Sequence, residues 1–362
     1  MTLIEELNGK ALRLGVPLSA HLDITYRCNE RCEHCYLNHD DKGEMGTDEI
    51  KYLLGQLASH GAFFLIISGG EPLLRRDCFE ILEHARKLLF NVKLKTNALL
   101  IGEHEAKLLV DLGVEQVQVS VYSHRPEVHD SITKVRGSLE RTLAAIRRVK
   151  SAGLRITIAN VLMKQNFSDY SGVQALAREL GVHSTLDPTI TPKMDGNTEV
   201  LQLRAPGSKL RSVFRDNELV GDVAEFCSPP APVSDEMLDG IPCGAGHTSV
   251  YVSPYGDVYP CVQFPLTCGN VRVQSFRDIW QNSPQLREVR FIRARDLSTC
   301  SSCAHVGTCS RCPGLAYMEG NMRGPSSADC EKAYARTGVR SAHQLRQSKF
   351  HPDSMNLVQI SV

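Results

Sequence analysis

The sequence predicts an α/β fold, a partial (β/α)6 barrel with a cysteine-rich C-terminal module. Three observations predict it: strand-like segments recur through the first half of the chain, helix-like segments alternate with them, and nine of the thirteen cysteines lie at or beyond residue 227. Strands that alternate with helices form parallel sheets with helical crossovers. The loops that leave the carboxyl ends of such strands are then the expected place for chemistry.

The expected elements follow from hydrophobic periodicity. Six segments are apolar or alternate apolar and polar residues, and are predicted as strands: His21–Thr25, Phe63–Ile67, Val92–Thr96, Val117–Val121, Ile156–Val161 and Ser184–Leu186. Five segments between them have helical periodicity: Thr47–Ser59, Asp77–Leu89, Glu103–Leu112, Ser138–Ala152 and Ser168–Leu180. Asp77 followed by Glu80 predicts a capping box at the start of one helix.

Composition changes divide the chain further. The alternating rhythm stops near Pro188, and a proline-rich stretch runs from Cys227 to Pro242. Beyond it, a hairpin is expected within Val250–Tyr259. The predicted divisions are an N-terminal extension (1–20), the barrel (21–205), a linker (206–242), the cysteine-rich module (243–335) and a C-terminal tail (336–362).

Charge and hydropathy exclude several classes of protein. Lysine plus arginine and aspartate plus glutamate each number 41, so the formal net charge is zero. This balance gives no electrostatic case for nucleic acid or a membrane surface as a partner. No apolar run is long enough to span a membrane, and the start lacks the order of a secretion signal. A cytoplasmic protein is expected, in which clustered cysteines are metal ligands or catalytic groups rather than disulfides.

The first cysteine group directly follows the first strand. Cys28, Cys32 and Cys35 have the spacing C-x3-C-x2-C. A structural zinc site needs four ligands, which His34 or His39 could complete. Alternatively, three thiolates hold a [4Fe–4S] cluster and leave one iron open to an outside ligand. The spacing alone leaves both alternatives open.

A second motif follows the second strand. It consists of four consecutive residues: Gly69, Gly70, Glu71 and Pro72. With the cysteine triad, it makes the region from His21 to Pro192 resemble the radical S-adenosylmethionine (radical SAM) enzymes. The resemblance implies that the triad holds a [4Fe–4S] cluster whose open iron is chelated by S-adenosylmethionine. It also implies that the Gly-Gly-Glu-Pro segment accepts hydrogen bonds from the amino group of this cofactor.

The resemblance implies further contacts to the cofactor. Tyr36 stands where the family has an aromatic residue against the adenine. Four more contacts are implied after the third and fourth strands: Thr96, Asn97, Ser120 and Tyr122. Ala98 stands where the family more often has glycine.

The second cysteine group resembles the SPASM extension that a subset of these enzymes carries. Cys243 and Cys261 enclose Gly256 in the pattern C-x12-G-x4-C. The resemblance implies two auxiliary [4Fe–4S] clusters, the second ligated by Cys300, Cys303, Cys309 and Cys330. The first would be ligated by Cys243, Cys261 and Cys312. Its fourth ligand would be Cys268, or alternatively Cys227, or its iron would stay open. A pair of zinc sites is the alternative for this region.

The function implied is that of a radical SAM oxidoreductase or maturase. Such an enzyme reductively cleaves S-adenosylmethionine to a 5′-deoxyadenosyl radical, which abstracts hydrogen from a substrate. A peptide or protein side chain is the expected substrate, as in the maturation of ribosomally made peptides. The alternatives are a tetrapyrrole or other cofactor precursor, sulfatase maturation, and a zinc-stabilised scaffold without radical chemistry. The implied partners are a low-potential electron donor (flavodoxin or ferredoxin) and a separate leader-peptide-binding protein, because the barrel begins near residue 21.

Overall fold

The computed structural model describes residues 2–40 and 42–349. The chain divides into two compact units, unit 1 (Met1–Ala205 and Gly244–Arg290) and unit 2 (Pro206–Cys243 and Phe291–Val362). Of the tail expected at 336–362, the first two residues end helix α15 (Ser327–Thr337) and Ala342–Lys349 form helix α16. Residues 350–362 lie outside the described residues.

Unit 1 contains one mixed sheet that does not close. Its strands are β1 (Ser19–Thr25), β2 (Phe64–Gly69), β3 (Asn91–Thr96), β4 (Gln116–Ser120), β5 (Arg155–Val161), β6 (His183–Asp187), β7 (Ser249–Val252), β8 (Asp257–Tyr259) and β9 (Gly269–Asn270). Their order is β6-β5-β4-β3-β2-β1-β7-β8-β9, and β1 to β6 are all parallel. The predicted α/β partial barrel is therefore confirmed.

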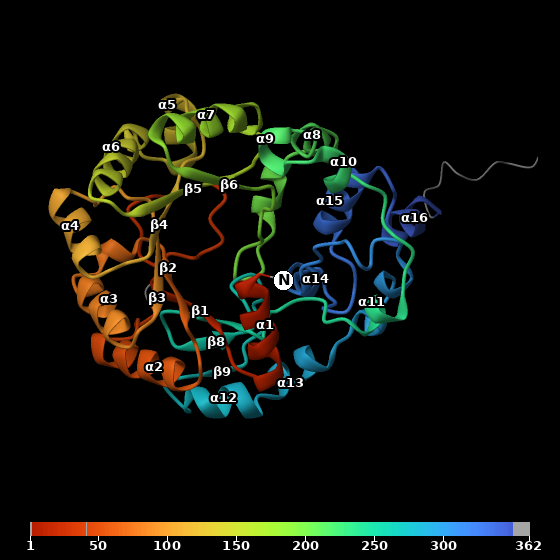
Figure 1. The fold of residues 1–362 in the computed structure, drawn as a ribbon, viewed down its shortest axis with the longest axis horizontal. Coiled ribbons are helices and arrows are strands. Elements are labelled where there is room, and N and C mark those ends of the chain that lie inside the picture. The colour runs from red at the N-terminus through yellow and green to blue at the C-terminus, as the bar shows by residue number, and fades with distance from the viewer. Residues whose placement is uncertain (1, 41, 350–362) are drawn as a thin grey trace, which may run out of the picture. The chain divides into compact units, whose positions relative to one another are not determined.

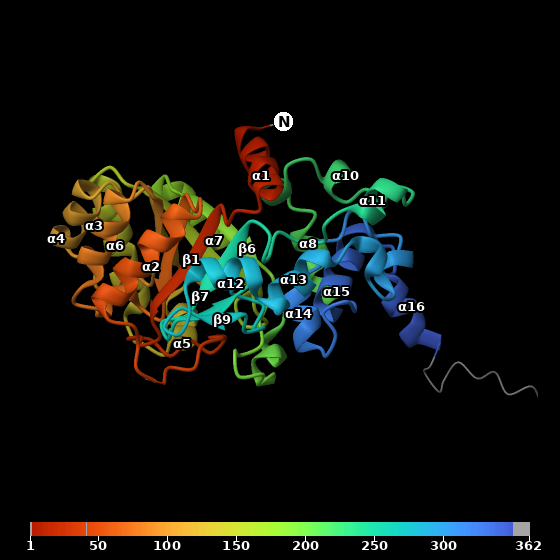
Figure 2. The same ribbon diagram turned by 90° about the horizontal axis from the view of Figure 1, so that it is seen from below.

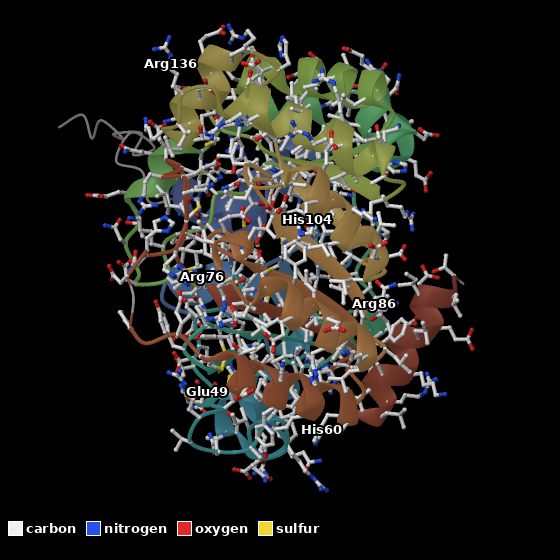
Figure 3. All side chains as sticks on the ribbon, turned by 90° about the vertical axis from the view of Figure 1, so that its left-hand side faces the viewer. Glu49, His60, Arg76, Arg86, His104 and Arg136 are labelled. Carbon is white, nitrogen blue, oxygen red and sulfur yellow. The ribbon has the colours of Figure 1, made fainter. Side chains whose placement is uncertain are left out.

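Helices cover the outer side of the parallel strands (Figure 1). They are α2 (Thr47–Ser59), α3 (Cys78–Lys87), α4 (Glu103–Asp111), α5 (Pro126–Thr133), α6 (Ser138–Ser151) and α7 (Tyr170–Leu180), with α1 (Leu3–Leu14) preceding the sheet. Figure 3 looks onto this layer, with Arg86 of α3 and His104 of α4 labelled. Helix α2 shows how this layer is packed: Ile50, Leu53, Leu54 and Leu57 follow the helical period and are all buried.

The strands alternate between two environments. Leu22, Val92 and Val117 belong to the apolar core between the sheet and the helices. Along each of these strands, polar residues alternate with the apolar ones. Several of the polar side chains line a cavity on the other face of the sheet: His21, Lys95 and Gln118. The alternation seen in the sequence thus separates an apolar outer face from a polar inner face.

The predicted hairpin lies at the edge of the same sheet. β7 pairs with β8 in antiparallel orientation. β7 also pairs in parallel with β1, beside which it lies in Figure 2. Helices α12 (Phe276–Asn282) and α13 (Pro284–Phe291) follow. Residues 244–290 of the cysteine-rich module expected at 243–335 therefore belong to unit 1, because this strand pairing extends the barrel sheet.

The predicted capping box at Asp77 is wrong. Asp77 is the N-cap of α3, but its side chain makes no capping hydrogen bond. Its carboxylate instead pairs with the Arg75 guanidinium, at 2.9 and 2.6 Å, and accepts a hydrogen bond from the Thr47 hydroxyl. A guanidinium with two nitrogens in reach is a stronger partner for a carboxylate than one backbone N–H. Arg75 also donates to the carbonyls of Ile24 and Met45, so this pair fixes the end of β1.

Unit 2 consists of short helices and turns. The elements of unit 2 are α8 (Gly207–Val213), α9 (Asn217–Val220), α10 (Val223–Phe226), α11 (Asp235–Asp239), η4 (Ala294–Asp296), η5 (Cys300–Ser302), α14 (Pro313–Met318), α15 (Ser327–Thr337) and α16. The 3-10 turns η1 (Pro72–Leu74), η2 (Phe167–Asp169) and η3 (Glu199–Leu203) belong to unit 1. Across the described residues of both units, no helix has the length and apolar character that a membrane crossing requires.

Candidate active site

A cavity of about 530 Å³ opens among the loops at the carboxyl ends of the parallel strands. Most of the expected cofactor contacts and all three cysteines of the first group line it: Cys28, Cys32, Cys35, Tyr36, Gly69, Gly70, Thr96, Asn97, Ser120 and Tyr122. These residues come from segments more than ninety positions apart in the sequence. The topology of the sheet brings them together because parallel strands present their carboxyl ends at one edge.

The three cysteines of the first group share this cavity on one irregular loop after β1. Burial raises the pKa of the Cys28 thiol to about 12 and also raises the pKa values of Cys32 and Cys35. Protonated thiols give up their protons when they bind iron. Three cysteines on the wall of a cavity fit a [4Fe–4S] cluster with one iron left for an outside ligand.

Gly69 and Gly70 are required by a close approach of two backbone segments. Gly69 has φ 137°, and a Cβ there would lie 2.1 Å from the Thr25 carbonyl oxygen. At Gly70 a Cβ would lie 2.3 Å from the Arg27 carbonyl oxygen. The amide of Gly70 donates to Thr25, and the amide of Glu71 donates to Arg27. The two glycines therefore allow the backbone of the cysteine loop to pack directly against the end of β2.

Glu71 and Pro72 lie behind the cavity wall and do not line the cavity. The Glu71 side chain is fully buried and accepts hydrogen bonds from the Thr96 hydroxyl and from the amides of Asn97 and Leu73. Burial raises the pKa of Glu71 to about 7. Pro72 begins the turn η1. Glu71 therefore holds the end of β3 in place.

Asn97 connects the end of β3 to the cysteine loop. Its side-chain amide donates to the Asn29 side chain at 2.7 Å and lies 3.9 Å from the Cys28 sulfur. The next residue, Ala98, has φ 64°, a left-handed conformation that favours glycine. This conformation explains why a glycine is more common at this position in the family that the sequence resembles.

Tyr122 packs against the other side of the cysteine loop. Its ring makes an edge contact with His34 and stacks on His129, and its hydroxyl lies 4.0 Å from the Cys32 sulfur. His129 accepts a hydrogen bond from the Tyr122 amide, which gives this histidine a structural role. Asp130 accepts hydrogen bonds from Gly137 and from other groups at the start of α6, and so caps that helix.

Sequence reasoning did not identify the residues of the inner wall. His21, Lys95 and Gln118 line the cavity below the cysteine loop. The His21 Nε2 atom lies 3.1 Å from Asp23, whose other carboxylate oxygen accepts a hydrogen bond from the Tyr251 hydroxyl. The alternation of polar and apolar residues in β1, β3 and β4 was the available signal.

A second cavity, of about 50 Å³, lies within unit 2 and brings together four cysteines. They are the expected ligands of the second auxiliary cluster: Cys300, Cys303, Cys309 and Cys330. Arg311 and Asp329 line the same cavity. Four thiols around one cavity fit the donor set of a [4Fe–4S] cluster.

The cysteines assigned to the first auxiliary cluster are divided between the units. Cys243 and Cys312 belong to unit 2, and Cys261 belongs to unit 1. Cys268 is part of the apolar core of unit 1, and its thiol donates to the Leu266 carbonyl oxygen. The thiol of Cys227 donates to the Phe214 carbonyl oxygen in unit 2. The ligands of this cluster, including the fourth, stay a prediction.

Comparisons with known proteins define the class. Residues 22–176 match the family model of the radical SAM superfamily, and residues 243–313 match that of the SPASM iron–sulfur cluster-binding domain. The chain belongs to the radical SAM superfamily, in the group that carries a SPASM domain. It is therefore an enzyme, which decides against a zinc-stabilised scaffold. These domains take a [4Fe–4S] cluster with S-adenosylmethionine, and auxiliary iron–sulfur clusters.

Relatives of known activity cover most of the chain. An AdoMet-dependent heme synthase of Methanosarcina barkeri is 29% identical over 82% of this chain and 90% of its own length. The mycofactocin maturase MftC of Mycobacterium tuberculosis is 27% identical over 93% of this chain and 89% of its own length. The crystal structure of Streptococcus suis SuiB bound to precursor peptide SuiA matches with a TM-score of 0.71 and 20% identity, over 89% of this chain and 78% of that chain.

Proposed function

We propose that this radical SAM enzyme modifies a side chain of a peptide or protein. When bound, the cluster and S-adenosylmethionine supply a 5′-deoxyadenosyl radical that abstracts hydrogen from the substrate. The observation that carries the proposal is the single cavity that Cys28, Cys32 and Cys35 share with the polar inner wall of the barrel. A substrate on that wall would lie next to the place where the radical forms.

The comparisons support a peptide as the substrate class. MftC is named a maturase, and SuiB was crystallised with a precursor peptide. The loop at Thr189–Thr191 and the residues Val262 and Gln263 also line the cavity. The Gln263 side-chain amide donates to the Thr191 hydroxyl at 2.8 Å, so two segments distant in sequence join on one side of the cavity. We infer that a low-potential electron donor and, for a leader peptide, a separate binding protein assist the reaction.

Co-expression tests the substrate class. The chain is produced anaerobically with each short peptide that is encoded beside its gene, and the peptides are analysed by mass spectrometry. We expect one peptide to change in mass with the native chain and to stay unchanged with the Cys28→Ala variant. The proposal fails if every peptide stays unchanged while the purified enzyme cleaves S-adenosylmethionine normally.

A tetrapyrrole precursor is the second candidate substrate. The heme synthase of Methanosarcina barkeri aligns over most of both chains. Incubation of the reduced enzyme with S-adenosylmethionine and iron tetrapyrroles that carry carboxylate side chains tests this candidate. A tetrapyrrole product that requires Cys28 would replace the peptide in the proposed reaction.

A further inference from the structure

The inner wall of the cavity carries a lysine beside a glutamine. In the sheet register, Lys95 of β3 pairs with Gln118 of β4, and both side chains line the cavity. Paired residues on adjacent strands lie about 5 Å apart and point to the same face. The ammonium of Lys95 and the side-chain amide of Gln118 can therefore reach one bound group.

Lys95 is a partly buried cation without a bonded partner. Among the described residues, none forms a hydrogen bond or an ion pair with its ammonium, and burial lowers its pKa. An unpaired charge in such a place costs free energy until an opposite charge arrives. The side chain of Gln118 likewise has no hydrogen-bond partner in the described part of the chain.

The acidic groups near Lys95 have other partners. Asp23 accepts hydrogen bonds from His21 and Tyr251. Asp187, which also lines the cavity, accepts a hydrogen bond from the Thr189 amide. Neither forms an ion pair with Lys95 within the described residues, although both favour its charged form. The imidazole of His21 is not a second cation, because burial lowers its pKa.

We propose that Lys95 and Gln118 form a subsite for a carboxylate of the substrate. The ammonium of Lys95 supplies a charge-assisted hydrogen bond, and the amide of Gln118 donates a second one. This proposal rests on the proposed function, because it takes the cavity as the substrate site. A terminal carboxylate or a carboxylate on a side chain would satisfy the same two donors.

The position of Lys95 separates this subsite from the expected cofactor contacts. Leu94 pairs with Ile67, and Ile67 pairs with Leu22, so Lys95 lies at the level of Asp23, inside the barrel. The cysteine loop begins only after β1 ends at Thr25. A carboxylate held at Lys95 would therefore direct the rest of the substrate toward the cysteine loop.

Binding of three peptide probes tests the subsite. The probes are N-acetyl-Ala-Ala with a free terminal carboxylate, the same dipeptide as its amide, and N-acetyl-Ala-Glu amide with its carboxylate on a side chain. Each is titrated calorimetrically into the cluster-loaded enzyme with S-adenosylmethionine and without reductant. We expect an acidic probe to bind about tenfold more tightly than the neutral amide. The acidic probe that binds more tightly shows whether the subsite takes a terminal carboxylate or a side-chain carboxylate.

Variants of two lysines on β3 complete the test. Lys95→Met should abolish the preference for the acid, and Lys95→Arg should keep part of it. Lys93→Met is the matched control, because Lys93 lies two residues before Lys95 on the same face of β3 but does not line the cavity. The proposal is overturned if the native enzyme binds no acidic probe preferentially, or if Lys95→Met keeps the preference. It is also overturned if Lys95→Met loses affinity for S-adenosylmethionine instead. None of these readouts requires radical formation, so the proposed function is judged separately by 5′-deoxyadenosine production.

Discussion

The hydroxyl of Thr96 lies 2.8 Å from both carboxylate oxygens of Glu71. Since the carboxylate also accepts from the amide of Asn97, it fixes the two residues that connect β3 to the cavity. The sequence motif led us to expect that this segment binds the cofactor's amino group. The structure gives the Glu71 side chain a positioning role.

The Glu71→Ala substitution tests this role. It leaves two buried donors, the Thr96 hydroxyl and the Asn97 amide, and the partly buried Leu73 amide without an acceptor. The free energy of unfolding should therefore fall by about 3 kcal/mol or more. Binding of S-adenosylmethionine should weaken with it, because the end of β3 is released. Chemical denaturation and equilibrium binding measure the two effects. Native stability combined with weak cofactor binding would show that the carboxylate acts on the cofactor directly.

Two glycines in different surroundings, Gly69 at the end of β2 and Gly55 within α2, predict opposite effects of alanine substitution. Gly69→Ala places a Cβ against the Thr25 carbonyl at a positive φ, and should cost about 3 kcal/mol or more of stability and most of the bound iron. Gly55→Ala is the control: Gly55 lies within α2, with no atom within 4 Å of the added Cβ. It should raise stability by about 0.5–1 kcal/mol. Thermal unfolding checks both, and equal effects would contradict the close approach at Gly69.

Asp77 should contribute stability that depends on acid pH. Its partner Arg75 lowers the pKa of Asp77 from 3.8 to about 2. A lowered carboxyl pKa stabilises the fold above about pH 3.8, and this contribution is lost as the pH falls toward 2. After allowance for solvent exposure, Asp77→Asn should cost about 1 kcal/mol at pH 7 and little at pH 2. Glu80→Gln, the other half of the expected capping box, should have a smaller effect. Urea unfolding at several pH values separates the two.

Arg311 should raise the reduction potential of the second auxiliary cluster. Its guanidinium lines the cavity of the four cysteines. Burial raises the pKa of the Cys300 thiol, and Arg311 opposes this rise by its charge and by a hydrogen bond. Positive charge and hydrogen bonds to the sulfurs favour the reduced cluster. Arg311→Gln should therefore lower the potential, as measured by redox titration with electron paramagnetic resonance. Arg295→Gln, which removes only an exposed ion pair with Asp239, should leave the potential unchanged.

Much of the barrel was predictable because its signals are local. The period of Thr47–Ser59 gave the bounds of α2, and the alternation in β1, β3 and β4 gave the strands. The direction of the polar face was not predictable, because alternation looks the same whether polar residues face solvent or a cavity. The partner of Asp77 was also not predictable from local pattern. Arg75 competes with the backbone N–H groups of α3 for the Asp77 carboxylate only in the folded turn.

The pairing of β7 with β1 was also beyond local signals. It joins Ser19 to Ser249, across more than two hundred residues. The cysteine spacings alone left zinc and iron–sulfur sites open, and the Gly-Gly-Glu-Pro segment after the second strand was needed to favour the cluster. The family matches confirm the class of enzyme. The inner-wall residues Lys95 and Gln118 needed the register of β3 and β4 before they could be recognised as neighbours.

The central claim is that Cys28, Cys32 and Cys35 hold the cluster at which S-adenosylmethionine is cleaved. The most direct measurement is dithionite-dependent formation of 5′-deoxyadenosine by the anaerobically reconstituted enzyme, with the three cysteines replaced together by alanine. The Cys78→Ala variant is the control, because Cys78 is buried in the apolar core of unit 1. The triple variant should contain about four irons fewer per chain and form no 5′-deoxyadenosine, while the control forms it at the native rate. Formation of 5′-deoxyadenosine by the triple variant would contradict the account.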